Sequence, residues 1–237
     1  MADYRQFELV ERLIEASGQF HLTGKDDIQS LGWKHAHDGE NIFLPTIKKG
    51  GFGLQEALEK RMAIRMYDFA PVDLEDIGTV LSASVEGDML DWSEQREVGI
   101  DLSVFVISWR VDGLDCPAVY RYQKDHHALI KVGEAPSQEE GGKLFLQKEF
   151  SWAPAVVVIS GSLRTSVDYY GSHGYRHLLI RGGAAGYRAW LAALTLGYEG
   201  SVFAGMLPVS ARELLKIDGH NEAQLFAFSF GRPVRFA

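Results

Sequence analysis

Apolar residues recur along this chain at two spacings, and each spacing predicts a different kind of element. In Tyr4–Ala16, the residues Phe7, Val10, Leu13 and Ile14 recur three and four positions apart, which places them on one helical face. The same criterion predicts helices over Leu54–Arg61, Tyr175–Leu196 and Pro208–Leu215. In the first of these, Leu54, Ala57 and Leu58 are expected to face inward. Another helix is expected to begin at Asp73, which is a good N-cap residue.

Short apolar runs rich in β-branched residues predict strands. They are Ser103–Trp109, Val119–Tyr122, Ala128–Val132, Ala155–Ser160 and Gln224–Phe230. The second and third are separated by a turn-like segment and predict a hairpin, whereas Ala155–Ser160 is apolar on both faces and reads as a central strand. This order of helices and strands predicts a single α+β domain whose sheet is covered by helices.

Glycines inside the longest predicted helix add a packing constraint. Gly182, Gly183 and Gly186 each cost about 1 kcal/mol relative to alanine in a helix interior. Their presence indicates that another element packs very close to this helix backbone.

Composition excludes several classes of protein. The 237 residues contain 24 Lys and Arg against 32 Asp and Glu, a net charge of −8, which argues against a nucleic-acid partner. The lone Cys116 excludes an internal disulfide framework and a Cys-rich metal site. No apolar run approaches the roughly 18 to 20 residues that span a bilayer, and the charged start is not a secretory signal. We therefore expect a cytoplasmic protein with no membrane partner.

Arginines are the first candidates for chemistry. Arg61 and Arg65 stand near a predicted helix end, and Arg232 follows the last strand. A guanidinium suits a phosphate because its planar fork donates two parallel charge-assisted hydrogen bonds. The alternative is that these are solvated helix-end charges.

The second candidate is the segment VDYYGSHGYR at 167–176, interpreted as a Gly-bearing turn that enters a helix. Tyr169 and Tyr170 could move protons if nearby positive charge from His173 or Arg176 favoured the phenolate. The alternative is an aromatic loop with solvated polar tips.

Other signatures of chemistry are weak or absent. His173 and His177 are four apart, but no carboxylate or cysteine nearby completes a ligand set, so no metal site is expected. The stretch GGAAG at 182–186 is not a G-x-G-x-x-G fingerprint, and no G-x-S-x-G elbow is present.

Several segments, taken in order, resemble the nitroreductase-like flavoproteins, and most closely their azoline dehydrogenases, which tailor ribosomal peptides. They are FHLTGK at 20–25, LP at 44–45, EALEKRMAIRMYDFAPVDLEDIGTVLSAS at 56–84, RVDGLDCPAVYRYQKDHHAL at 110–129, DYYGSHGYRHLLIRGGAAG at 168–186, ALTLGYEG at 193–200 and FSFGRP at 228–233. The resemblance implies a dimeric α+β fold with a mainly antiparallel sheet flanked by helices. It divides the chain into an N-terminal helix and arm at 1–52 and a flavin-binding domain at 53–237, compact as one unit.

The resemblance also assigns cofactor residues. It implies FMN at the subunit interface, with Arg61 and Arg65 holding the phosphate and ribityl chain and Arg232 giving a second phosphate contact. Glu199 and Gly200 match positions where main chain lies close to the flavin ring. Small residues at such positions allow backbone N–H groups to approach the ring system.

Three departures from the family pattern bear on cofactor binding and catalysis. The family's Pro-Ser-Ala/Gly-Gly stretch is replaced by EQREVGID at 94–101, and Ala63 replaces the serine between the two arginines. The Lys-Tyr pair of the peptide oxidases reads Tyr169-Tyr170 here, so the resemblance implies that Tyr170, or Tyr169, is the base.

The resemblance implies an FMN-dependent dehydrogenase that oxidises a C–N or C–C bond in natural-product biosynthesis, such as azoline to azole in a modified peptide. One alternative is a degenerate, non-catalytic subunit of a modifying complex. Another is an NAD(P)H-dependent reductase of nitro compounds or quinones. A homodimer is expected, a heterodimer is the alternative, and the substrate is a peptide or a small molecule.

Overall fold

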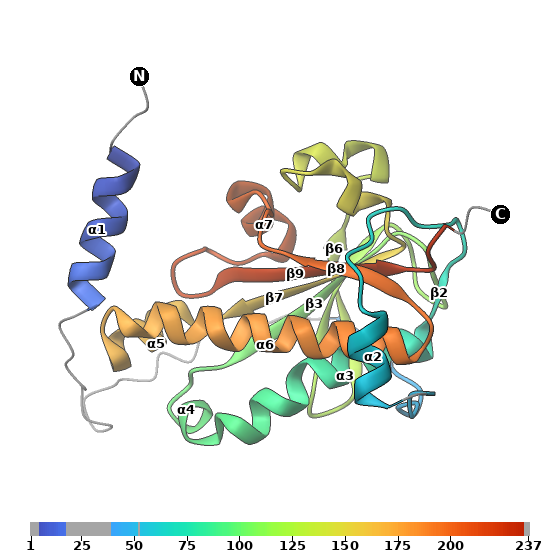
Figure 1. Cartoon of the computed structure of the whole chain (residues 1–237), viewed down its shortest axis with the longest axis horizontal. Coiled ribbons are helices and arrows are strands. Elements are labelled where there is room, and N and C mark those ends of the chain that lie inside the picture. Colours follow the sequence, from blue (N-terminus) through green and yellow to red (C-terminus); the bar gives the residue numbers. More distant parts are fainter. Residues whose placement is uncertain (1–4, 18–38, 52, 235–237) are drawn as a thin grey trace.

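The computed structural model of the chain describes residues 5–17, 39–51 and 53–234, and its core is one large sheet with helices on both faces (Figure 1). Tyr4 and most of the predicted arm, including the FHLTGK segment at 20–25, lie outside the described residues.

The main sheet has seven strands in the order β1-β6-β5-β3-β7-β9-β8, and every neighbouring pair is antiparallel. Their bounds are β1 Ile42–Phe43, β3 Leu102–Ser108, β5 Ala118–Gln123, β6 Ala128–Glu134, β7 Ala155–Gly161, β8 Glu199–Phe203 and β9 Ala223–Gly231. The predicted hairpin is confirmed as β5–β6. The predicted central strand is confirmed as β7, which is the third strand counted from the β8 edge. A separate parallel pair joins β2 (Val72–Asp73) to β4 (Val111–Asp112).

Helices cover both faces. They are α1 Arg5–Ser17, α2 Leu54–Lys60, α3 Leu74–Asp91, α4 Ser93–Glu97, α5 Leu163–Tyr170, α6 His173–Thr195 and α7 Pro208–Leu215, with 3-10 helices η2 Gln138–Lys143 and η3 Lys148–Trp152. One buried cluster lies between the sheet and helices α3 and α6, and a second lies between the opposite face and α7, η2 and η3. The mixed α+β architecture with an antiparallel sheet is therefore confirmed.

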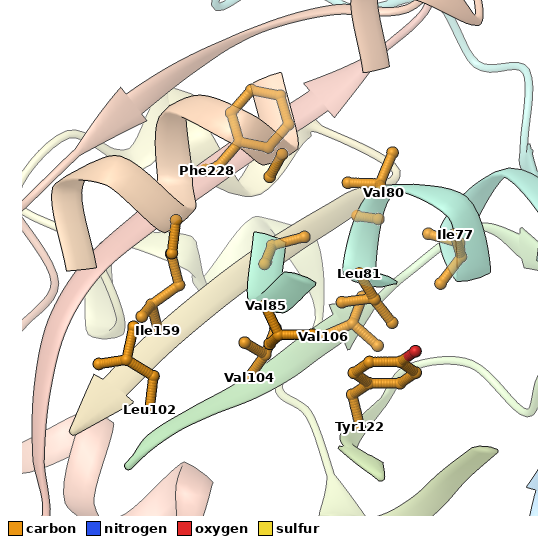
Figure 2. Close-up of a cluster of buried hydrophobic side chains, with 14 of the residues drawn as sticks. Ile77, Val80, Leu81, Val85, Leu102, Val104, Val106, Tyr122, Ile159 and Phe228 are labelled. Atoms are coloured by element: carbon orange, nitrogen blue, oxygen red, sulfur yellow. The ribbon is translucent and has the colours of Figure 1, made fainter. Parts of the chain in front are cut away.

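Alternation along β3 shows how one strand serves both clusters. Leu102, Val104 and Val106 belong to the α3 and α6 side, where Figure 2 shows them beside residues of α3 such as Leu81. Phe105 belongs to the opposite side. Successive side chains of a strand point to opposite faces, so a strand buried on both faces is apolar throughout.

The helix glycines have the predicted role. A Cβ at Gly182 would meet the side chain of Leu225 at 3.0 Å, and one at Gly186 would meet Ile159 and Val202 at 3.5 Å. Gly182 therefore lets α6 lie closely against β9. The prediction of close packing on this helix is confirmed.

The inward face predicted for Leu54–Arg61 is wrong for Leu54 and Leu58. Leu54 and Leu58 are 64% and 46% exposed, and only Ala57 of that set is buried. Val10, Leu13 and Ile14 are also exposed, because α1 stands away from the sheet (Figure 1). An amphipathic pattern identifies an apolar face and does not identify what covers it.

The segment at 167–176 is also corrected. Residues Val167 to Tyr170 are the last turn of α5, not part of a loop, and Gly171 at φ 59° ends that helix. The sequence pattern also missed β8 and α4, which are only five residues each.

A buried ion pair ties α6 to α3. Arg181 donates from Nε and Nη2 to the two carboxylate oxygens of Asp88, at 2.7 and 2.8 Å, and Nη2 also donates to the Ile100 carbonyl at 3.0 Å. Both side chains are almost fully buried. Because the pair lies in the α3–α6 interface, it fixes how these helices pack.

Replacing Asp88 with Asn keeps the side-chain shape and leaves the Arg181 charge buried without a counter-ion. We expect Asp88→Asn to lower the free energy of unfolding by about 3 to 5 kcal/mol, measured by urea denaturation. The control Asp168→Asn breaks the exposed Arg164–Asp168 pair and should cost less than about 1 kcal/mol. Equal losses in the two variants would contradict this role.

Candidate functional site

An irregular segment, residues 61–68, lies along the β8 edge of the sheet. Ala63 forms an isolated bridge with Gly200, and the Ile64 N–H donates to the Gly200 carbonyl at 3.0 Å. Further along, the Asp68 N–H donates to the Arg232 carbonyl at 2.9 Å. The structure therefore brings together the main chain of the predicted positions 61, 65, 199, 200 and 232, which are far apart in sequence.

The three predicted arginines each cover an aromatic ring. The guanidinium carbon of Arg61 lies 4.8 Å from the Trp190 ring centroid, that of Arg65 lies 5.4 Å from Phe150, and that of Arg232 lies 5.6 Å from Tyr198. Arg61 is half-buried, and Arg65 and Arg232 are exposed. Such cation–π contacts orient a guanidinium and leave its N–H donors free for an anion.

None of these three guanidiniums forms an ion pair with a carboxylate among the described residues. Four other arginines of the described residues each pair with an aspartate: Arg96, Arg164, Arg181 and Arg188. In a protein of net charge −8, the three unpaired arginines make the edge locally positive from both faces of the sheet, because Trp190 and Tyr198 belong to the cluster on the α6 side and Phe150 to the opposite one. Their donor chemistry fits a phosphate.

Tyr67 fixes this segment in place, and the sequence reasoning missed it. Its hydroxyl contacts the Ile64 carbonyl at 2.8 Å and Ser229 Oγ at 2.9 Å, which joins the segment to β9. Burial raises the pKa of Tyr67 well above its usual value, so it stays a neutral hydrogen-bonding group. Tyr67 follows Arg65 by two positions, but its partner Ser229 is 162 residues away, so no local signal pointed to it.

Gly200 has a structural reason to be glycine. A Cβ there would lie 2.1 Å from the Ser229 carbonyl oxygen and 3.0 Å from the Phe230 Cα. Atoms of β9 therefore occupy the place that a side chain at position 200 would take. Glu199, the first residue of β8, is half-buried next to it.

Tyr169 and Tyr170 lie elsewhere, at the end of α5. The Tyr170 hydroxyl accepts a hydrogen bond from Gln95 Nε2 at 2.7 Å, and its ring stacks on His177 at 4.6 Å. Tyr169 meets the Tyr170 ring edge-on at 4.6 Å. Gln95 belongs to α4, so the stretch that replaces the family's Pro-Ser-Gly pattern is a short helix that positions Tyr170.

The expected charge partners of Tyr170 are arranged differently. Arg176 is exposed, and within the described chain it makes no contact with Tyr170. Burial lowers the pKa of His177, with smaller contributions from the charges of His173 and Arg181, so the stacked ring is neutral near pH 7.

The two halves of the predicted site lie toward opposite ends of α6. His177, under Tyr170, and Trp190, under Arg61, are thirteen residues apart on this helix, or about 20 Å along its axis. One chain therefore does not bring the predicted base next to the predicted phosphate-binding arginines.

A hollow of about 350 Å³ lies beside the 61–68 segment. It is lined by Met66, Tyr67, Phe69, Arg110, Gln138, Trp152 and Val234. Phe69 and Trp152 are exposed large apolar residues, at 89% and 43%. The edge that carries the arginines is thus flanked by apolar surface of the kind found at ligand sites and subunit contacts.

Two other kinds of feature are absent from the described residues. Among residues 5–17, 39–51 and 53–234, no group of three or more His, Cys, Asp and Glu side chains is placed to hold a metal ion. Within the same ranges, no helix combines the length and the apolar character needed to cross a bilayer.

Comparison with known proteins decides the family. The sequence profile of the Nitroreductase family matches residues 58–232. The chain belongs to the Nitroreductase family. This segment runs from α2 to Arg232 and includes all the candidate residues named above. Nitroreductases are flavin oxidoreductases that generally bind FMN, and proteins of this fold are commonly dimeric.

A curated relative is similar over most of its length. It is a candidate nitroreductase, MJ1384, of Methanocaldococcus jannaschii, 26% identical over 201 residues that cover 83% of this chain and 98% of the relative.

Solved structures share the nitroreductase fold at low sequence identity. A candidate nitroreductase of Anabaena variabilis superposes with a TM-score of 0.64 at 23% identity; the match covers 76% of this chain but only 38% of that longer one. A chain of the Escherichia coli microcin synthetase McbBCD complex, with truncated pro-MccB17 bound, gives 0.59 at 16%, covering 99% and 95%. A nitroreductase-type protein of Exiguobacterium sibiricum in complex with FMN gives 0.54 at 12%, covering 79% and 91%. At these identities the likeness establishes the fold alone.

The close approach at Gly200 gives a test of the edge. We expect Gly200→Ala to displace β8 from β9 and lower the free energy of unfolding by about 1 to 3 kcal/mol, as overpacking does. Thermal or urea unfolding measures this. Gly133→Ala is the matched control, since a Cβ there meets nothing within 4 Å. If the two variants were equally stable, strand β9 would not be what requires glycine at 200.

Proposed function

We propose that this nitroreductase-family chain is an FMN-dependent dehydrogenase. The observation that carries the proposal is the set of three arginines, Arg61, Arg65 and Arg232, held near one edge without carboxylate partners. A phosphate monoester carries close to two negative charges, so several guanidinium donors stabilise it better than one. The FMN complex of the Exiguobacterium protein supports the same cofactor here.

Each group of the edge has a proposed role in holding the cofactor. Arg61, Arg65 and Arg232 bind the phosphate, and main chain at Glu199 and Gly200 lies next to the ring system. Tyr67 keeps the arginine segment in register. FMN, when bound, supplies the acceptance of a hydride from a carbon next to nitrogen, oxygen or sulfur.

Tyr170 is the proposed base. Its hydroxyl is oriented by Gln95 Nε2 and its ring is fixed against His177, so its oxygen has one defined direction. It would take the proton that leaves the substrate together with the hydride, which leaves a double bond in the substrate. Tyr169, which packs edge-on against it, is the second candidate.

A dimer would solve the separation between the two halves of the site. A two-fold axis that runs α6 of one chain antiparallel to α6 of its partner brings the Tyr170 end of one helix to the Arg61 end of the other. Exposed apolar residues on this side support such an interface: Ile180 of α6, Leu54 and Leu58 of α2, and Met62. We therefore propose a homodimer whose two sites are each completed by both chains.

The proposed substrate is a modified peptide whose azoline rings are oxidised to azoles. The likeness to a chain of the McbBCD complex, which covers nearly the whole of both chains, supports peptide tailoring. A second candidate is a non-catalytic subunit of a modifying complex. McbBCD is itself a complex, and the Lys of the family's Lys-Tyr pair is replaced by Tyr169 here. Stoichiometric FMN and oxidation of an azoline peptide by the purified chain alone would exclude that candidate.

Arg61 tests the phosphate assignment. We expect Arg61→Ala to weaken FMN binding roughly 10- to 100-fold, the value of a charge-assisted hydrogen bond of about 1.5 to 3 kcal/mol. Quenching of FMN fluorescence on titration measures this. The control Arg164→Ala removes an exposed arginine of α5 and should leave the affinity unchanged. Wild-type affinity in Arg61→Ala would show that the phosphate binds elsewhere.

Tyr170 tests the base. We expect Tyr170→Phe to keep FMN and to slow oxidation of an azoline peptide by roughly 10²- to 10⁴-fold, the usual contribution of general-base catalysis. The readout is loss of two hydrogen atoms from the peptide by mass spectrometry. Tyr175→Phe, in the first turn of α6, is the control. An unchanged rate in Tyr170→Phe would remove this residue from the mechanism.

A further inference from the structure

Strands β3 and β5 pair over only part of their length. Their register runs from Phe105 opposite Arg121 to Ser108 opposite Ala118. Before Phe105, β3 continues to pair with β7 alone, and after Arg121, β5 continues to pair with β6 alone. The two strands therefore diverge within the sheet, and Arg121 stands where the divergence begins.

A cavity of about 340 Å³ occupies the space between the diverging strands. Residues 101–104 line one side and residues 121–126 line the other, with Val85 and Ile130 completing the wall. Strands that diverge leave N–H and C=O groups on their facing edges without ladder partners, and such groups bind extended main chain.

Two polar contacts cross this gap. At its base, Arg121 Nη2 donates to Ser103 Oγ at 2.9 Å. At its mouth, Lys124 Nζ lies 3.0 Å from Asp101 Oδ1, which also accepts from Arg96 Nε at 3.0 Å. Asp101 thus balances the cations at the mouth, and the Arg121 guanidinium at the base has no such partner.

The charged form of Arg121 is less favourable in this cavity than in water. Burial lowers the pKa of its guanidinium, against the opposing effect of Glu222 and Asp101, and neither carboxylate is within ion-pair distance of it in the described chain. Its Nε and Nη1 have no hydrogen-bond partner among the described residues. A guanidinium with its donors free in a cavity favours an anionic oxygen ligand.

The surrounding charges favour a single negative charge. Asp101 and Asp125 line the cavity, and Glu222 acts on Arg121 from β9's side of the sheet, so a dianion would be repelled more than a carboxylate. The volume lies at the small end of the roughly 300 to 1,000 Å³ typical of ligand sites. It suits a short terminal segment better than a long chain.

We propose that this gap binds the C-terminal end of an extended peptide, with the terminal carboxylate on Arg121 and the main chain between β3 and β5. The site is separate from the arginine edge. β5 and β8 are four strand spacings apart, or about 19 Å across the sheet. It does not depend on flavin binding.

Isothermal titration of the full-length chain with acetyl-Ala-Ala-Ala tests this. We expect saturable binding of one peptide per chain, and binding at least 10-fold weaker for the same peptide as its C-terminal amide, which lacks the charged oxygen. Sodium propionate and inorganic phosphate are the comparison ligands. No saturable binding of the acid, equal binding of the amide, or equally tight binding of propionate or phosphate would each overturn the proposal.

Two variants locate the site. Arg121→Met removes the guanidinium, and Gln123→Glu adds a carboxylate to the lining while it keeps Arg121 and the side-chain shape. Both should weaken binding of the acid peptide at least 10-fold. The controls Arg164→Met and Gln147→Glu make the same changes at exposed positions and should bind as the wild type does. Circular dichroism checks that each variant is folded, and a folded Gln123→Glu that binds like its control would show that the peptide binds elsewhere.

Discussion

Two main-chain hydrogen bonds at one edge of the sheet determine where the positive charge of this protein gathers. The Ile64 N–H to Gly200 and the Asp68 N–H to Arg232 join an irregular segment to the ends of β8 and β9. Without them, Arg61 and Arg65 would be ordinary charges after a short helix. With them, the two arginines lie near a third that is far away in sequence. The collision that a side chain at Gly200 would cause with Ser229 shows how little room this junction has.

The three unpaired arginines can be compared with the other arginines of the molecule. Elsewhere in the described chain, Arg96, Arg164, Arg181 and Arg188 pair with aspartates, whereas others such as Arg121 have no such partner. Although the net charge is −8, no carboxylate of the described residues forms an ion pair with Arg61, Arg65 or Arg232, and their donors are left for an external anion. Membership of the Nitroreductase family makes the FMN phosphate the anion that we propose, and the length of α6 is the reason for proposing that two chains share one site.

The sequence pattern predicted the elements that depend mainly on residues close together in the chain. The apolar strands, the β5–β6 hairpin and the close packing at Gly182 followed from β-branched runs, turn residues and helix glycines. The inward face of α2 did not, because the buried core leaves the apolar residues Leu54 and Leu58 exposed. Strand β8 was missed because five residues that include a glycine and a serine give little signal.

The site was predictable in part. The resemblance supplied Arg61, Arg65 and Arg232 by their residue types, and the fold then showed their main chain to be adjacent. Tyr67 and the Arg121 gap could not be foreseen, because each depends on strand register, which is a long-range property. That Tyr170 and Arg61 contact residues about 20 Å apart along α6 likewise could not be foreseen before α5 and α6 were placed.

The central claim is that the arginine edge recognises a phosphate, and a comparison of FMN with riboflavin tests it most directly. The two flavins share one ring system and differ in the terminal phosphate. Titrated against the same purified protein, FMN should bind at least 100-fold more tightly, since about 1.4 kcal/mol corresponds to each factor of ten and several charge-assisted bonds are lost with riboflavin. Equal affinities would show that the arginines do not hold the phosphate, and the account of this edge would be wrong.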